Sequence, residues 1–171
     1  AYSEGDGAVV VDQGLAASVV DVDSADFNGG SLTVSLPAGS DAGEDVLSIR
    51  HQGLGAGQIG FVAGTVSYGG VAIGTAVGGS AGAPLVVTFT SAAADPNSVS
   101  ALLQNITFED TDTDDPTTGP RTVRFAVNDG DGGTSLDADA TVTVSGVNDV
   151  PTLTNLAGDA LAYSEGDGAL V

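Results

Sequence analysis

The stretch Ser31-Leu-Thr-Val-Ser-Leu36 decides the fold class, because its polar and apolar residues alternate. In an extended strand, successive side chains point to opposite faces, so Leu32, Val34 and Leu36 share one face that needs cover. Similar apolar stripes recur along the chain, at Val46–Ile49, Val66–Tyr68, Val71–Ile73, Leu85–Phe89, Ile106–Phe108, Val123–Val127 and Val142–Val144. Half-buried strands separated by glycine and asparagine turns are typical of a sandwich. We therefore predict an all-β fold of about nine strands, arranged as a Greek-key β-sandwich.

Two local features interrupt this strand pattern. The pair Gly69-Gly70 predicts a two-residue hairpin turn inside an uncharged, glycine-rich stretch, Gly53–Gly82, which we interpret as an inserted hairpin. The other feature is a helical signal, in which Asp95 and Pro96 precede the run Val99–Gln104. Because aspartate caps helices and proline suits the first turn, we expect one short helix there.

The charge of the chain is strongly negative and unevenly placed. Its 171 residues include 23 acidic residues and three basic ones, giving a formal charge of -20. Nucleic acids and anionic membrane surfaces are therefore not expected as partners. The hydrophobic fraction of 42% shows that the chain can still bury a core. A salt-adapted surface would scatter its carboxylates, whereas Gly53–Ala94 carries no charge at all, so the clustering favours bound divalent cations.

Missing residue types exclude several kinds of chemistry. The chain has no cysteine, which excludes disulfides, thiolate metal sites and cysteine nucleophiles within it. No apolar run reaches the length of a membrane-spanning helix, so we expect no membrane insertion. Since no charged, signal-like segment begins the chain, we expect its targeting information to lie elsewhere in a longer protein.

An internal repeat sets the expected domain boundaries. The octapeptide Ala1-Tyr-Ser-Glu-Gly-Asp-Gly-Ala8 recurs without change at positions 162–169, an offset of 161 residues. Such self-similarity predicts a tandem array with one unit in every 161 residues. We expect residues 1–150 to form one repeat unit that lacks its first residues. Residues 151–171 would then be the linker and the first strand of the next unit.

The first acidic group offers candidate calcium ligands. Calcium takes six to eight oxygen ligands, so it needs several carboxylates brought together. If residues 20–23 form a strand, Asp21 and Asp23 point the same way, before a turn that carries Asp26 and Asn28. These four residues are candidate ligands. The alternative is a solvated asparagine and glycine turn.

Two further acidic groups follow. The second consists of Glu109, Asp110, Asp112, Asp114 and Asp115. It superficially matches an EF-hand loop, but Asp115 and Arg121 stand where that loop needs glycine and glutamate, which excludes an EF-hand. Five carboxylates so close together repel one another without a counter-ion. The third group, Asp129 and Asp131, lies in a glycine-rich turn after a strand and is either a ligand pair or an ordinary turn.

The motifs of the last third carry a family resemblance. They are Asn105–Asp110, Pro116–Gly119, Arg121–Phe125, Asn128–Gly133 and Val147–Pro151. With them the chain resembles the bacterial cadherin-like repeats of giant RTX-type adhesins, over nearly its whole length and least clearly through Gly53–Gly82. The resemblance implies a sandwich of the cadherin and immunoglobulin kind.

The resemblance also implies calcium sites at the junctions between units. Asn148-Asp149-Val-Pro151 is similar to a cadherin linker motif, with Gly146 at the place of the first aspartate of that motif. Glu4 and an acid from Glu109 to Asp112 would close on Asn148 and Asp149 at the bottom of the unit. Asp21, Asp23, Asn28 and Asp129 would face the preceding linker at the top, and Glu165 would repeat the role of Glu4 in the next unit.

Nothing in the sequence predicts catalysis. His51 is the single histidine, and we expect it to have a surface or hydrogen-bonding role near a strand end. No motif pairs a base with a nucleophile, and a sugar-cleaving cleft lined by tryptophan is excluded because the chain has none. We therefore predict that the chain is not an enzyme.

The expected function is structural. We predict a Ca²⁺-binding extender unit of a large extracellular bacterial adhesin or cell-surface protein, in which calcium stiffens the junctions. Its partners would be neighbouring copies joined head to tail, with host or biofilm glycans or proteins bound through other domains. Two alternatives stay open: a self-assembling extracellular fibre or surface-layer subunit, and a carbohydrate- or protein-binding module that uses Gly53–Gly82.

Overall fold

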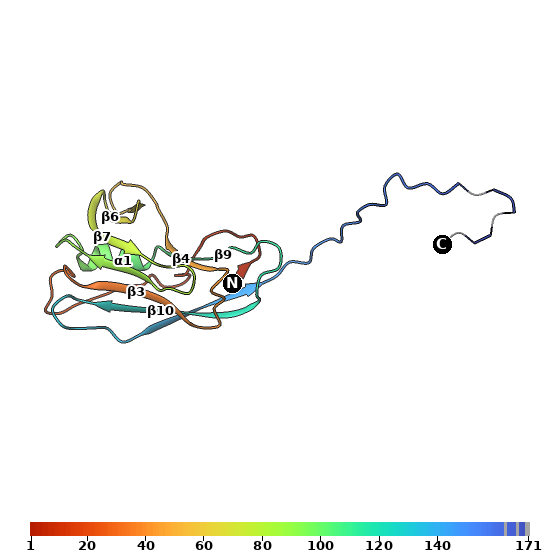
Figure 1. Ribbon diagram of the computed structural model, residues 1–171. Helices are drawn as coiled ribbons and strands as arrows, with labels where there is room; N and C mark the ends of the chain where they lie inside the picture. The colour runs from red at the N-terminus through yellow and green to blue at the C-terminus, as the bar shows by residue number, and fades with distance from the viewer. Residues whose placement is uncertain (163, 167, 170–171) are drawn as a thin grey trace.

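Two β-sheets enclose one apolar core (Figure 1). The computed structural model describes residues 1–162, 164–166 and 168–169. Its strands are β1 (Tyr2–Ser3), β2 (Val9–Val10), β3 (Ser31–Ala38), β4 (Asp45–Ile49), β5 (Ile59–Val62), β6 (Thr65–Tyr68), β7 (Val71–Val77), β8 (Leu85–Phe89), β9 (Ile106–Asp110), β10 (Gly119–Asn128) and β11 (Ala138–Ser145). The larger sheet has the order β1-β11-β10-β3-β8-β7-β6-β5, and the smaller has the order β2-β9-β4. This architecture confirms the predicted all-β class.

The core follows the alternation seen in the sequence. Leu32 and Val34 of β3 are fully buried, and β3 is paired with β10 on one side and with β8 on the other. Across the core, the ring of Tyr2 meets that of Phe108 edge-on, with centroids 5.4 Å apart. Because Tyr2 belongs to the larger sheet and Phe108 to the smaller, this contact joins the two layers.

The predicted helix is present and is capped as expected. Helix α1 spans Pro96–Leu103, and the Asp95 carboxylate accepts a hydrogen bond of 2.8 Å from the backbone N–H of Ser98. Its buried residues include Val99 and Leu102, which join the core. The helix therefore acts as a packed crossover between β8 and β9.

The glycine-rich insertion forms two consecutive hairpins rather than one. Strands β5, β6 and β7 extend the larger sheet beyond β8, with β5 at its edge. Gly69 and Gly70 form the β6–β7 turn with φ of 58° and 82°, a conformation that only glycine adopts at low cost. The expected hairpin turn is confirmed, while β5 was not predicted because a glycine-rich stretch precedes and interrupts it.

The strand expected at residues 20–23 is not formed. This segment is a loop in which Val20 and Val22 are exposed. The Asp21 carboxylate accepts hydrogen bonds from the backbone N–H groups of Asp23 and Ser24, both at 3.1 Å. A side chain that bonds its own backbone in this way favours a turn over a strand ladder, and this explains the error.

The chain leaves the sandwich after β11, at the end where the N-terminus also lies (Figure 1). The described part of residues 151–169 belongs to no named strand. The first strand expected for a next unit includes Tyr163, Asp167, Leu170 and Val171, which lie outside the described residues. Within the described ranges, no helix combines the length and apolar character needed to cross a membrane.

Candidate functional site

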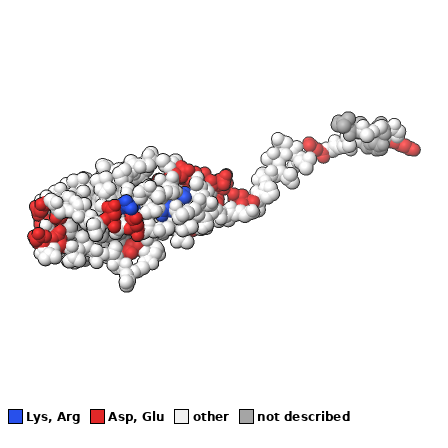
Figure 2. All heavy atoms as spheres, turned by 90° about the horizontal axis from the view of Figure 1, so that it is seen from below, with Lys and Arg blue, Asp and Glu red and all other residues white. Residues whose placement is uncertain are grey.

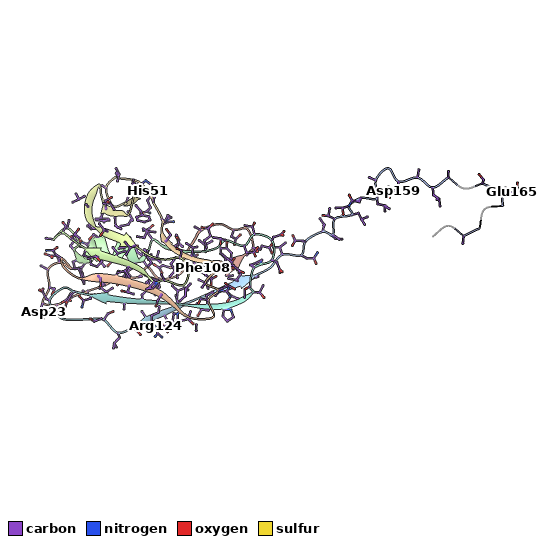
Figure 3. All side chains as sticks on the ribbon, in the orientation of Figure 1. Asp23, His51, Phe108, Arg124, Asp159 and Glu165 are labelled. Atoms are coloured by element: carbon purple, nitrogen blue, oxygen red, sulfur yellow. The ribbon has the colours of Figure 1, made fainter. Side chains whose placement is uncertain are left out.

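Acidic side chains gather at the two opposite ends of the sandwich, and others lie beside basic residues between the ends (Figure 2). Asp23 marks one end, while the chain leaves from the other end toward Asp159 and Glu165 (Figure 3). The sequence-predicted candidates therefore separate into two groups, one far from the exit and one beside it.

The far group lines a hollow that we call the acidic hollow. Asp21 and Asp23 contribute to it from the loop before β3, and Asp129 and Asp131 from the turn after β10. The hollow has a volume of about 410 Å³. The structure thus brings together four of the predicted residues from segments about a hundred positions apart in the sequence.

Hydrogen bonds hold the carboxylates of the acidic hollow in place. Hydrogen bonds from the backbone N–H groups of Asp23 and Ser24 lower the pKa of Asp21. The Asp21 side chain raises the pKa of the nearby Asp23. On the facing turn, Asp129 Oδ1 accepts from the backbone N–H groups of Asp131 and Gly133, at 2.8 and 2.9 Å. The pKa of Asp23 is raised first by its side-chain hydrogen bond with Asp21 and then by the negative charge of Asp21, a repulsion that a cation would relieve.

Two candidates of the far group do not line the hollow. Asp26 Oδ1 accepts a hydrogen bond of 3.0 Å from the backbone N–H of Asn28, so this pair closes a local turn. The Ser24 hydroxyl instead links the loop to Asp131, at 3.4 Å.

The second group surrounds the point where the chain leaves the sandwich, which we call the junction end. The Glu4 carboxylate accepts a hydrogen bond of 2.6 Å from the backbone N–H of Val147. The Tyr2 hydroxyl donates to the backbone carbonyl of Asp110 at 2.8 Å, which places the end of β9 beside β1. Asn148 and Asp149 follow directly after Val147 and are exposed, with the Asn148 amide donating to the Asp149 carbonyl.

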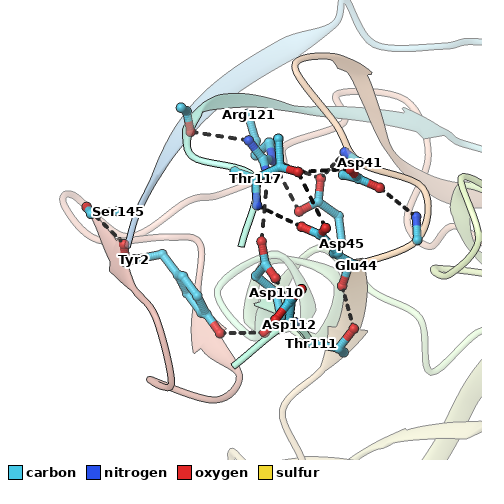
Figure 4. A network of polar contacts seen from close by, with 12 residues as sticks. Tyr2, Asp41, Glu44, Asp45, Asp110, Thr111, Asp112, Thr117, Arg121 and Ser145 are labelled. Carbon is cyan, nitrogen blue, oxygen red and sulfur yellow. Dashed lines mark hydrogen bonds and ion pairs between the residues drawn. The ribbon is translucent and has the colours of Figure 1, made fainter. Parts of the chain in front are cut away.

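A buried arginine network underlies the junction end (Figure 4). Arg121 is 1% exposed, and its Nε donates to both carboxylate oxygens of Asp45, at 2.9 and 3.1 Å. Its terminal nitrogen donates to the Thr117 carbonyl at 2.6 Å. Because a buried guanidinium is stable only when paired and hydrogen-bonded, Asp45 and Arg121 must be present together.

Two of the predicted ligands serve this network and its loop. Asp110 is buried, which raises its pKa, and its Oδ2 has no hydrogen bond but lies 3.6 Å from Arg121. Asp112 Oδ1 accepts from the backbone N–H groups of Asp114 and Asp115, both at 3.0 Å, and these bonds lower its pKa. Asp110 therefore faces the internal cation Arg121.

The carboxylates of Asp41, Glu44 and Asp45 were not anticipated at this end. Thr117 is held by both Asp41 and Glu44, through its hydroxyl and its backbone N–H. The sequence did carry a signal. Asp45, Leu47 and Ile49 occupy every second position of β4, so the Asp45 side chain shares the inward face of the two apolar residues. Arg121 likewise shares the face of Val123, and a cation on an apolar face needs an acidic partner.

The described residues do not present a preassembled metal centre. In this part of the chain, no group of three or more His, Cys, Asp or Glu side chains is placed to hold a metal ion. The donor chemistry at both ends nevertheless suits a hard cation, since it consists of carboxylates with backbone and amide carbonyls nearby. Glu165 lies in the segment beyond Pro151 and is exposed.

His51 has the hydrogen-bonding role expected of it. Its Nδ1 accepts a hydrogen bond of 2.9 Å from the backbone N–H of Phe61 in the edge strand β5. Gln52 bonds the same strand, since its side-chain oxygen accepts from the N–H of Ile59 at 2.9 Å. These two side chains occupy backbone donors that an edge strand would otherwise expose.

Comparison with known proteins found no match to this chain among protein-family models, curated proteins or solved structures.

Proposed function

We propose that this chain is a calcium-binding structural repeat of a large extracellular bacterial adhesin or surface protein. One observation carries the proposal: the acidic groups lie at opposite ends of the sandwich, and the segment leading to the second copy of the octapeptide leaves from one of those ends. If the segment before the second octapeptide copy runs parallel to β11, as β1 does, the junction end of one unit meets the acidic hollow of the next. Calcium bound between them would stiffen the array.

The strand order supports a Greek-key, cadherin-like assignment. If the inserted strands β5–β7 and the following strand β8 are set aside, the remaining seven strands, in chain order, form sheets of order 1-7-6-3 and 2-5-4. Immunoglobulin-type Greek-key sandwiches share the orders 7-6-3 and 2-5-4, but their first strand lies beside strand 2 rather than beside strand 7. The parallel pairing of β1 with β11, with Tyr2 opposite Val144, places the first and last strands side by side. The first strand and the strand before the exit segment therefore both belong to the larger sheet.

Electrostatics supports a cation at each end. The chain carries a formal charge of -20, and Arg121 and Arg124 are already paired with Asp45, Asp137 and Asp139. Among the described ion pairs, none joins a basic side chain to a carboxylate of the acidic hollow. A divalent cation supplies the missing positive charge without a large change of fold.

Thermal unfolding tests the proposal. After chelation, calcium at a hundredfold excess over its dissociation constant should stabilise the folded chain by about 2.7 kcal/mol. Magnesium should stabilise it much less, because it demands tight octahedral geometry and holds its water. A melting temperature unmoved by millimolar calcium would refute the calcium-binding role.

A further inference from the structure

One edge of the larger sheet is only partly covered. Strand β1 pairs with β11 at two positions, Tyr2 with Val144 and Ser3 with Ser145. From Ala138 to Thr143, β11 has a strand neighbour on its β10 side, and among the described residues no strand pairs with it on the other side. This edge offers backbone donors and acceptors for a further stretch of strand.

Two adjoining hollows make this edge a groove, which we call the β11 groove. The first has a volume of about 340 Å³ and lies between Val9–Val11 and the edge residues Thr141 and Val142, next to Ala1. The second, of about the same volume, continues past Ala138–Ala140, with Leu103, Phe125 and Val127 contributing to its largely apolar lining. Val11 lines both hollows, which therefore adjoin at this residue.

We infer that the β11 groove binds the segment Leu156–Leu161 of a second copy of this unit. The octapeptide that contains β1 is repeated at residues 162–169, so Leu156–Leu161 is the sequence that precedes this motif. Since β1 runs parallel to β11, whatever precedes Ala1 enters along the open part of the same edge. The inference rests on the proposed tandem arrangement for the identity of the occupant.

The register of β1 places one side chain of that segment. Tyr2 lies opposite Val144, so the position directly before Ala1 lies opposite Val142, and the corresponding residue in the second copy is Leu161. Because side chains alternate, this position shares the inward face of Tyr2, which is 1% exposed. Leu161 would therefore enter the hollow beside Val142.

The segment itself has the properties of an occupant. Leu161 is 74% exposed in the structure, so it carries apolar surface that docking would remove from water. The backbone N–H of Asp159 donates to the Leu156 carbonyl at 3.3 Å, a turn that opens when the segment extends along β11. Strand addition with apolar anchors is an established mode of peptide binding.

A peptide titration tests the groove directly. The full chain, labelled with ¹⁵N and kept in chelator, is titrated with a synthetic peptide of the sequence Pro151–Leu161. Saturable amide shifts are expected at Ala138–Thr143 and Val9–Val11. The Leu161→Asp peptide should bind at least about tenfold more weakly, because it replaces an apolar anchor with a charge. Shifts outside the groove, or equal binding of both peptides, would overturn the inference.

A second measurement uses the covalent arrangement. Placing the sequence Pro151–Leu161 directly before Ala1 of the full chain should raise the melting temperature by about 3–8 °C in chelator. The same extension carrying Leu161→Asp should give no rise, and equal melting temperatures for the two extended chains would contradict groove filling. Both measurements are made without calcium, so a chain that fails to respond to calcium would refute the proposed function and leave this inference standing.

Discussion

The Glu4 carboxylate accepts a hydrogen bond at 2.6 Å from the backbone N–H of Val147, the second residue after β11. This bond ties the turn after the first strand to the start of the exit segment. It engages Oε2 of Glu4, and Asn148 and Asp149 follow Val147 directly. The same octapeptide places Glu165 at the corresponding position of the second copy.

Calcium at this junction should change the shape of a tandem protein. A two-unit chain is expected to have a longer maximum dimension with calcium than with chelator, because a bound ion fixes the linker. Small-angle scattering measures the difference, and Asp149→Ala should abolish it while Asp137→Ala, in the exposed ion pair of Arg124, should not. Equal dimensions in both conditions would show that the junction is not a calcium hinge.

The Arg121 network should be essential for folding stability. Asp45→Ala leaves a buried guanidinium without its bidentate partner, which costs roughly 3–5 kcal/mol in comparable buried pairs. Urea unfolding measures the loss. Asp137→Ala is the matched control, because it removes a carboxylate from the exposed ion pair of Arg124 and should change stability little. Equal losses in the two variants would contradict the role assigned to burial.

The strand pattern and the helix cap were predictable because they depend on local spacing. The alternation in β3 and the Asp95 cap of α1 both took the predicted form. The loop before β3 was not predicted correctly, since residues 20–23 alternate like a strand while Asp21 bonds its own backbone. Alternation alone does not reveal that the Asp21 side chain takes up backbone N–H groups that a strand would pair with its neighbour.

The grouping of the acidic residues was only partly accessible from sequence. Asp21 and Asp129 were both candidates, but their meeting in one hollow depends on the antiparallel pairing of β3 with β10. The Arg121 network was missed because Asp45 and Arg121 are 76 positions apart. Their inward positions on two strands signalled burial, yet sequence spacing does not pair distant strands.

Asp23 should couple pH, calcium and stability. Its folded pKa is raised above the ordinary value of 3.8 by the adjacent Asp21. This group therefore stabilises the fold below pH 3.8, and the contribution is lost as pH rises through the raised folded value. In chelator at neutral pH, Asp23→Asn should raise the melting temperature, because it removes a charge that Asp21 repels.

The same substitution should reduce the calcium response. Asp23→Asn removes a carboxylate ligand from the acidic hollow, so the rise in melting temperature on adding calcium should shrink. Asp159→Asn is the charge-matched control and should keep the full response, since it lies outside the hollow. A full calcium response in the Asp23→Asn chain would exclude this residue as a ligand.

Head-to-tail association is expected for the chain in solution. Each copy offers one β11 groove and one Leu156–Leu161 segment, and because these are different surfaces, a bound pair still has a groove and a segment that can take up further copies. Light scattering should therefore show a mass that grows with protein concentration in chelator. Leu161→Asp should leave a monomer, whereas Leu153→Asp, at an exposed leucine outside the docking segment, should still associate. Removal of Thr152–Val171 should also leave a monomer. If the truncated chain or the Leu161→Asp chain associated as strongly as the intact chain, the Leu156–Leu161 segment would have no part in assembly.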